Sequence, residues 1–468
     1  MPVHLTSASY PMERRASSPA DAAQSTVPGS PFRPRMVHAN PMADLKPAIC
    51  SQVDALRDEL TAFLQKLVQF PSLPGFEQRA QYALAEKYES LGLSTDIVPS
   101  ELEELKDHPA FCDDGVPFRD RLNVIGVWRG SARRPSKSAH SLILNGHMDV
   151  VPTGSESLWS DSPWSGVIRD GRLYGRGSCD MKAGLAANVF AVQTLQALGY
   201  RPAADVLLES VIGEESGGVG TLTTIVKGYK ADAAVITEPT CLRACPVQSG
   251  ALTFRIRVRG RAIHACMKPY GVSAIEQFYK VLQAIQEMDA RRHIDYRNPL
   301  YENPNNIAPI NVGTVRAGDW PSTVPDELVA EGRLGVLPGE STDSARQAMA
   351  ATLHRLSESD PWLKENPPEL IWFEGQFESG QIAQDAPIVQ ALSACHKQIM
   401  GASPAIRGVT YGSDLRLFTN HGNIPAVLYG PGDVLHAHTV DEFVEIEEVV
   451  SATKVLALII TQWCGGGV

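Results

Sequence analysis

Two styles of apolar and polar patterning follow one another along the chain. From about residue 48 to residue 246, segments with an apolar residue every three or four positions alternate with short, almost unbroken apolar runs. The first spacing is typical of amphipathic helices, and the unbroken runs are typical of strands buried on both faces. Their alternation predicts an α/β fold in which helices flank a mixed, mostly parallel sheet.

The individual elements follow from the same pattern. Helices are expected at 54–70, 80–93 and 181–200. Strands are expected at 121–130, 141–150, 204–213 and 231–239. Gly199 stands where the third helix should end, because glycine is the usual residue just past a helix C-terminus.

The pattern changes after residue 246. The stretch ALTFRIRVRG alternates strictly between apolar residues and arginines, which predicts a strand with one solvated face rather than an arginine binding patch. The elements that follow are a helix at 273–290, strands at 307–315 and 327–337, a helix at 341–358 and a strand at 369–374. The order βαββαβ is typical of a ferredoxin-like α+β unit.

The first style returns near residue 377, so one domain is interrupted by another. A helix is expected at 386–400, a strand at 424–430 and a helix at 446–463. The predicted domains are a main domain in two parts, 46–246 and 377–468, with an inserted domain at 247–376. Residues 1–45 are rich in Ser, Pro, Ala and Arg and lack the apolar stretch of a secretory signal, which predicts a disordered tail.

Composition and charge exclude several classes of function. The formal net charge of −11 over 468 residues argues against nucleic acid as the main partner, since phosphate binding needs an excess of Lys and Arg. No run of about 18 apolar residues is present, so no membrane span is expected. The eight cysteines form no pair of CxxC motifs, which favours free thiols in the cytoplasm over a structural zinc site.

Polar residues stand where several of the predicted strands end. The chemistry-bearing residues are His147 with Asp149, Asp180, Glu214 with Glu215, Glu238, and His436 with His438. Ligands gather at the carboxyl ends of strands in parallel sheets. Carboxylates that share a pocket repel one another, and a divalent cation removes that cost. Mixed nitrogen and oxygen ligands suit zinc, with cobalt or manganese as alternatives, and the number of ligands suits two ions.

The two-residue spacing of His147 and Asp149 has a geometric consequence. Side chains two positions apart lie on the same side of an extended chain. His147 can therefore bind a metal through one ring nitrogen while Asp149 fixes the orientation of the ring.

Taken together, the motifs resemble those of a known family. GHMDVVP, GRLYGRGSCDMKAG, GEESGGVG, TEPT and the late HTVDE occur in the right order over residues from about 50 to 465. They resemble the family of acetylornithine deacetylase, succinyl-diaminopimelate desuccinylase, aminoacylase and carboxypeptidase G. The resemblance implies a zinc-exopeptidase-like fold, two co-catalytic metal ions and hydrolysis of an amide. It also implies that the inserted domain is a lid that forms a homodimer.

The resemblance assigns roles residue by residue. His147, Asp180 and Glu238 would hold one ion, and Asp180, Glu215 and His438 would hold the other. Glu214 would be the general base, and a cis peptide is expected between Asp180 and Met181. His264 in GRAIHAC would stabilise the oxyanion, often from the partner subunit, with Asn311 near it.

The substrate side departs from the family pattern. Gly335 stands where many deacylases have the arginine that binds the substrate carboxylate, and Arg333 faces the same way two residues earlier. Arg416, near the GSD motif, is a second candidate for that role. Cys179, which precedes the bridging aspartate, is expected to be a small packed residue.

The leading hypothesis is a metal-dependent hydrolase that cleaves the amide bond of a small N-acyl amino acid. If no arginine binds a carboxylate, the substrate would be an N-acylated amine without an amino-acid head, such as a formylaminopyrimidine. A carboxypeptidase or dipeptidase is a further alternative in the same site. A single-metal hydrolase and a non-catalytic binding protein are the remaining rivals, and an intact set of metal and base positions argues against the latter.

Overall fold

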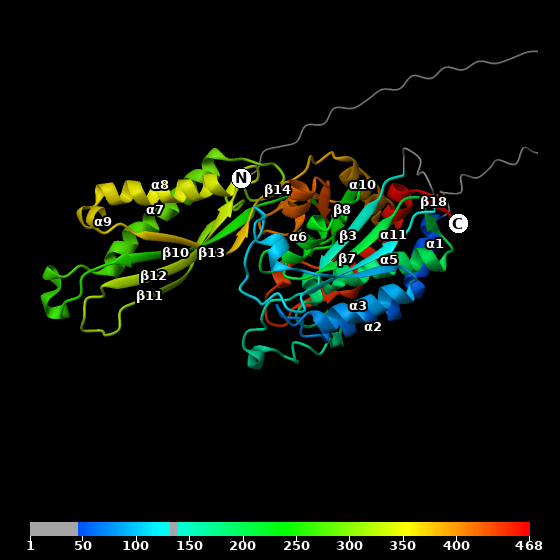
Figure 1. The fold of residues 1–468 in the computed structure, drawn as a ribbon, viewed down its shortest axis with the longest axis horizontal. Helices are drawn as coiled ribbons and strands as arrows, with labels where there is room; N and C mark the ends of the chain where they lie inside the picture. Colours follow the sequence, from blue (N-terminus) through cyan, green and yellow to red (C-terminus); the bar gives the residue numbers. More distant parts are fainter. Residues whose placement is uncertain (1–44, 132–138) are drawn as a thin grey trace, which may run out of the picture. The chain divides into compact units, whose positions relative to one another are not determined.

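The main feature of the fold is a nine-stranded sheet (Figure 1). The structure is a computed structural model that describes residues 45–131 and 139–468, so the predicted tail, apart from Leu45, lies outside the described residues. The sheet has the order β1-β2-β7-β3-β8-β16-β9-β14, and β15 pairs with β9. Its strands are β1 Ser94–Pro99, β2 Leu122–Trp128, β3 Leu142–His147, β7 Val206–Val211, β8 Ala233–Ile236, β9 Ala244–Gln248, β14 Gly380–Gln381, β15 Ile406–Val409 and β16 Ala426–Leu428.

Parallel pairing is concentrated in the middle of this sheet. Strands β7, β3, β8 and β16 are parallel to one another, and antiparallel strands β2 and β9 flank them. The predicted mixed α/β sheet is therefore confirmed. Because parallel strands end at the same edge, β3, β7 and β8 present their carboxyl ends side by side.

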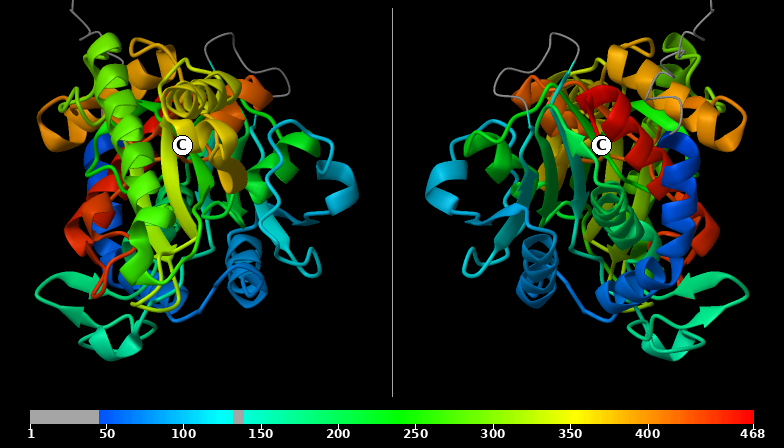
Figure 2. Two further views of the ribbon diagram at one scale, coloured as in Figure 1. Left: turned by 90° about the vertical axis from the view of Figure 1, so that its left-hand side faces the viewer. Right: turned by 90° about the vertical axis from the view of Figure 1, so that its right-hand side faces the viewer.

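Helices cover both faces of the sheet (Figure 2). Leu142 and Leu144 of β3 pack into one core, whereas Ile143 between them packs into a core on the other face. The first core includes residues of α1 Leu45–Ala55, α2 Arg57–Val68, α3 Gln78–Ser90, α5 Ala183–Ala197, α10 Pro387–Met400 and α11 Ile446–Cys464. The other face is covered by α6 Val219–Val226 and the π-helix η4 Leu417–Gly422. Burial on both faces explains why these strands are apolar throughout.

A second, four-stranded sheet has the order β11-β12-β10-β13 and is antiparallel. Its strands and helices are β10 Gly250–Arg259, α7 Ala274–Asp295, β11 Ile310–Ala317, β12 Glu327–Val336, α8 Thr342–Ser359 and β13 Glu369–Phe377. Their order is the expected βαββαβ. Phe254 and Ile256 are buried beneath the helices, while Arg255 pairs with Glu331 at 2.7 Å on the other face. The domain boundaries themselves remain predictions.

Two features of the main part were not expected. Helix α1 was not predicted, and the helix expected at 54–70 corresponds to α2. The two helices are separated at Leu56, whose ψ of 1° bends the chain between them. A small sheet of β4 Ile168–Arg169, β5 Arg172–Tyr174 and β17 Phe443–Glu445 was also missed.

The remaining elements are short. They are α4 Leu102–Leu105, η1 Glu156–Leu158, the π-helix η2 Ser178–Lys182, β6 Arg201–Pro202, η3 Ala265–Tyr270, α9 Pro361–Glu365, η5 Val434–His436 and β18 Gly466–Gly467. Among the described helices, none combines the length and the apolar character needed to cross a bilayer. All eight cysteines are free thiols, as expected.

Candidate metal centre and active site

The carboxyl ends of three neighbouring parallel strands form the site. His147 is the last residue of β3, Glu214 and Glu215 follow β7, and Glu238 follows β8. Since β3 lies between β7 and β8, the three ends converge on His147. Asp180 joins them from η2, the turn of π-helix before α5.

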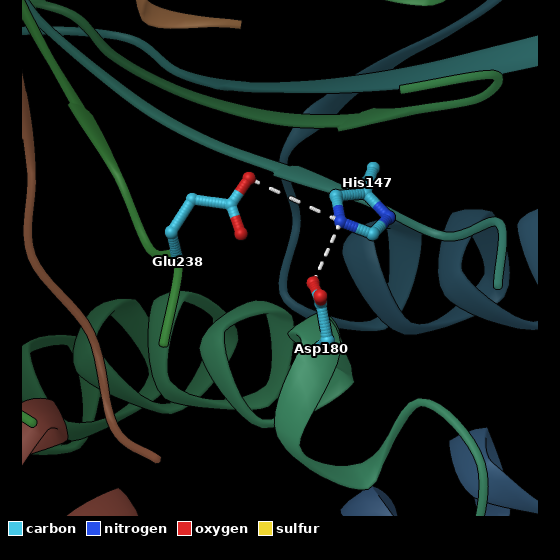
Figure 3. Close-up of side chains that lie close together, drawn as sticks. All are labelled: His147, Asp180 and Glu238. Atoms are coloured by element: carbon cyan, nitrogen blue, oxygen red, sulfur yellow. Dashed lines mark hydrogen bonds and ion pairs between the residues drawn. The ribbon is translucent and has the colours of Figure 1, made fainter. Parts of the chain in front are cut away.

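His147, Asp180 and Glu238 form the first candidate metal group (Figure 3). One ligand atom from each lies within 4.8 Å of the others. Nε2 of His147 is 3.1 Å from Oδ1 of Asp180 and 4.0 Å from Oε1 of Glu238. His147 and Glu238 are buried, so a cation held there would be largely shielded from water.

Asp180, Glu215 and His438 form the second candidate group. Nε2 of His438 lies 3.0 Å from Oε2 of Glu215 and 3.5 Å from Oδ2 of Asp180. Asp180 therefore belongs to both groups, with one carboxylate oxygen turned toward each. The peptide bond between Asp180 and Met181 is cis, as expected.

The electrostatics of the cluster favour a bound cation. Burial raises the pKa of Glu238 well above its ordinary value, and the nearby Asp180 and Glu215 raise it further. Hydrogen bonds to Asp180 and Glu215 raise the pKa of His438 to about 10. Buried carboxylates that repel one another lose this cost when a divalent ion binds them, and the nitrogen and oxygen donors suit such an ion.

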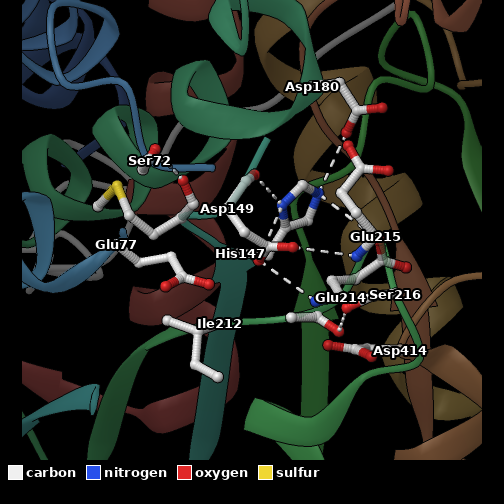
Figure 4. Close-up of polar contacts among 12 residues, drawn as sticks. Ser72, Glu77, His147, Asp149, Asp180, Ile212, Glu214, Glu215, Ser216 and Asp414 are labelled. Atoms are coloured by element: carbon white, nitrogen blue, oxygen red, sulfur yellow. Dashed lines mark hydrogen bonds and ion pairs between the residues drawn. The ribbon is translucent and has the colours of Figure 1, made fainter. Parts of the chain in front are cut away.

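Asp149 organises the site through its main chain and its side chain (Figure 4). Nδ1 of His147 contacts the main-chain oxygen of Asp149 at 2.9 Å. Because a carbonyl oxygen only accepts, Nδ1 donates its proton there, and Nε2, which faces Asp180 at 3.1 Å, is the ring nitrogen placed to bind a metal. We expected the carboxylate to fix the ring, but its Oδ1 lies 3.7 Å from Nδ1.

The Asp149 carboxylate instead binds the loop after β7. Oδ1 accepts the main-chain N–H of Glu214 at 3.2 Å, and Oδ2 accepts that of Glu215 at 3.1 Å. Burial raises the pKa of Glu214 well above its ordinary value, an effect that His147 opposes and that Glu238 and Asp414 reinforce. A carboxylate whose pKa is raised is suited to accept and return a proton near neutral pH.

A cavity of about 390 Å³ opens beside these carboxylates, within the usual size range for small-molecule sites. Strands β10, β12 and β13 of the four-stranded sheet and loops of the main part line it. They are Asp114, Glu214, Glu215, Ser216, Ala251, Thr253, Arg333, Gly375, Phe377, Tyr411 and Gly412.

The two arginine candidates lie in different places. Arg333 lines the cavity, where its Nη2 donates to the oxygen of Thr410 at 3.1 Å and its buried Nε has no partner among the described residues. Arg416 is fully buried and does not line the cavity; its Nη2 donates to the oxygen of Gly217 at 2.8 Å. Arg416 thus supports the loop that carries Glu214.

His264 and Asn311 lie outside the cavity. His264 is exposed at the start of η3, where its Nδ1 accepts the N–H of Cys266. Asn311 is exposed on β11, directly opposite Arg333 in the strand register. Neither side chain belongs to the residues that line the cavity beside Glu214.

Three residues of the site were not predicted. Oε1 of Glu442 accepts the main-chain N–H groups of Cys179 and Asp180 at 3.0 and 3.1 Å, which fixes the aspartate shared by the two candidate groups. The sequence could have indicated Glu442, because it is the last residue of the HTVDE motif. No local motif indicated Phe377 or Tyr411. Cys179 is buried and its thiol donates to the oxygen of Asp433, consistent with the packed role expected for it.

Comparison with known proteins gives consistent matches. A family model described as peptidase family M20/M25/M40 matches residues 143–462. The N-formyl-4-amino-5-aminomethyl-2-methylpyrimidine deformylase of Halalkalibacterium halodurans is 30% identical over 443 residues, which cover 89% of this chain and 97% of the relative. The acetylornithine deacetylase of Myxococcus xanthus is 27% identical over 76% of this chain and 87% of its own.

Solved structures share the fold. The M20 family metallo-carboxypeptidase Sso-CP2 from Sulfolobus solfataricus superposes with a TM-score of 0.67 at 17% identity. The match covers 86% of this chain and 99% of the carboxypeptidase. At that identity the match concerns the fold alone.

Proposed function

We propose a substrate for this chain, which belongs to peptidase family M20/M25/M40 and is an amidohydrolase. The substrate is the N-formyl amide of a small aminomethylpyrimidine, and the products are formate and the free amine. The observation that carries this proposal is the similarity to the aminopyrimidine deformylase over nearly the whole length of both chains. The aromatic ring of Phe377 in the cavity suits a flat heterocycle, which would stack against it.

The proposed cofactor is a pair of zinc ions, because the candidate ligands are imidazoles and carboxylates. His147, Asp180 and Glu238 would hold one ion, and Asp180, Glu215 and His438 the other. When bound, the ions supply positive charge that polarises the amide carbonyl and lowers the pKa of the attacking water.

The protein residues have separate roles in the reaction. Glu214 takes a proton from the attacking water and returns it to the leaving amine. Asp149 fixes the main chain of Glu214 and Glu215, so the base is held at a constant place relative to the candidate ligands. The raised pKa of Glu214 matches this exchange, because a stronger base accepts the proton more readily.

The proposed assembly is a homodimer formed through residues 247–376. Its support is the position of His264, which is exposed and outside the cavity of its own chain. In a dimer, His264 and Asn311 of one copy would reach the site of the other and bind the oxyanion. The proposed location is the cytoplasm, and no nucleic acid or membrane partner is proposed.

A second candidate substrate is an N-acyl amino acid, and Arg333 favours it. Its partly unpartnered guanidinium lines the cavity and could bind a carboxylate through its planar fork. The two candidates differ in one group, because the aminopyrimidine has no carboxylate for Arg333 to bind.

The test is amine release from a panel of N-formyl, N-acetyl and N-succinyl compounds. Half of the panel would carry an amino-acid carboxylate, and half would be neutral amines that include formylaminomethylpyrimidine. Each compound would be tested with the zinc-loaded parent enzyme, after chelation, and with Arg333→Ala. Preference for the formylpyrimidine in both proteins supports the first candidate. Preference for the carboxylates that is lost in Arg333→Ala supports the second, and no turnover of any compound contradicts both.

A further inference from the structure

One residue that lines the cavity has a buried hydroxyl without a partner among the described residues. Three side-chain hydroxyls belong to its lining residues: those of Ser216, Thr253 and Tyr411. Ser216 donates to Oδ2 of Asp114 at 2.9 Å, and Thr253 donates to the oxygen of Gly375 at 3.3 Å. The hydroxyl of Tyr411 is buried and has no hydrogen-bond partner within the described part of the chain.

An unpaired buried hydroxyl needs an explanation, because it has lost its hydrogen bonds to water and gained none from the protein. Burial raises the pKa of Tyr411 well above its ordinary value, and the charges of Glu238 and Asp180 contribute to the increase. The hydroxyl therefore stays protonated and lies within electrostatic reach of the candidate metal ligands. It is a neutral donor on a residue that lines the same cavity as Glu214 and Glu215.

The segment that carries Tyr411 is held on both sides. Before it, the oxygen of Thr410 accepts from Arg333. After it, the oxygen of Ser413 accepts from Nε2 of Gln248 at 3.0 Å, and Asp414 accepts from Thr221 at 2.6 Å. A donor whose position is fixed before the reaction needs no reorganisation when charge develops, and this is the condition for an effective oxyanion donor.

We propose that Tyr411 is a catalytic residue whose hydroxyl donates a hydrogen bond to the acyl oxygen of the substrate as that oxygen gains negative charge. The proposal rests on the amide hydrolysis proposed above. It gives each site a donor from its own chain, in addition to the one proposed from His264 of the second copy.

A bond forms between the water oxygen and the acyl carbon, the π pair of the C=O bond moves onto the acyl oxygen, and Glu214 takes the water proton. The C–N bond then breaks as that pair returns to re-form the C=O bond, and the amine leaves with the proton from Glu214. Tyr411 keeps its proton throughout.

The experiment replaces Tyr411 by Phe in the full-length, zinc-loaded enzyme. With the best substrate of the panel, we expect kcat to fall about 100-fold with little change in KM, since the donor acts on the transition state. The number of bound ions and the melting temperature should not fall, because the hydroxyl has no partner in the free enzyme. Tyr301→Phe is the matched control: its buried hydroxyl bonds Ser249 and Val409, outside the cavity, so it should lose stability but keep kcat.

A second measurement does not depend on turnover. Methylphosphonate, a tetrahedral anion, would be titrated into both zinc-loaded proteins by calorimetry. We expect it to bind the parent about ten times more tightly than Tyr411→Phe. Equal binding, a kcat within twofold of the parent, or a loss of ions in the variant would overturn the role of Tyr411. No turnover by the parent, together with the expected difference in anion binding, would contradict the proposed substrates but retain the donor.

Discussion

The carboxylate of Asp149 accepts the main-chain N–H of Glu214 at 3.2 Å, while the main-chain oxygen of the same aspartate contacts His147 at 2.9 Å. One residue thus fixes the proposed general base with its side chain and a candidate metal ligand with its backbone. The two tasks can be separated by mutation, because a substitution changes only the side chain.

Asp149→Asn should lower kcat without removing metal. The amide group of Asn keeps one acceptor oxygen but leaves the other N–H of the Glu214 loop unpaired, so we expect a loss of about 10- to 100-fold. The ring of His147 keeps its carbonyl partner, and both ions should remain bound. Steady-state kinetics and elemental analysis of the purified variant would check this. Loss of an ion would show that the carboxylate, rather than the carbonyl, holds the ring.

Glu214→Gln should abolish most of the activity. Removal of a general base costs about 10²- to 10⁴-fold, and Gln has nearly the same shape, so the ions and the fold should be retained. Glu215→Gln is the matched comparison on the same loop. It should lose activity together with bound metal, because Glu215 belongs to the second candidate group. A Glu214→Gln enzyme with near-parental kcat would exclude it as the base.

The number of ions bound per chain should depend on the two candidate metal groups. The parent should bind two ions per chain, whereas His147→Ala and His438→Ala should each retain about one, since each group would lose one ligand. Asp180→Ala should weaken both sites because Asp180 is shared. Chelation should abolish the activity of the parent, and added zinc should restore it. Two tightly bound ions in the Asp180 variant would contradict the shared ligand.

The raised pKa of Glu209 predicts how the stability of the protein depends on pH. Burial raises the pKa of Glu209 from the ordinary 4.5 to about 7. The folded state then holds a proton that the unfolded state has released, so stability falls as pH rises from about 4.5 to about 7. Glu209→Gln removes this titration. Its free energy of unfolding relative to the parent should rise by about 2–3 kcal/mol between pH 5 and pH 8. The same difference in unfolding free energy between variant and parent at pH 5 and pH 8 would contradict the raised pKa.

If the protein is the proposed homodimer, two inactive variants should restore activity to one another when their subunits are mixed. His264→Ala and Glu214→Gln should each be inactive alone. After subunit exchange, each mixed dimer has one site with an intact base and an intact His264, so about a quarter of the parental activity should return. Kinetics before and after exchange would measure the recovery. No recovery, with mixed dimers shown by mass spectrometry, would place His264 outside the reaction.

Much of the metal centre could be predicted from the sequence, because most of its residues stand at the ends of predicted strands. His147, Glu214, Glu215 and Glu238 stand directly at or after buried apolar runs, and the ends of neighbouring parallel strands meet at one edge of the sheet. Asp180 and the pair His436 and His438 were candidates from the same pattern, and the family resemblance selected His438. The structure brings Asp180 and His438 to the same place. The order βαββαβ was likewise visible in the pattern alone.

What the sequence determined by itself is therefore the residue types at the strand ends and the sheet that gathers them, since local periodicity sets both. Only the tertiary structure decided that Asp149 uses its carbonyl for His147, that Arg416 is buried and Arg333 is not, and that Phe377 and Tyr411 line one cavity. These relationships depend on loop paths and on packing between segments far apart in the chain. No short stretch of sequence contains both partners of such contacts, so no local pattern can encode them.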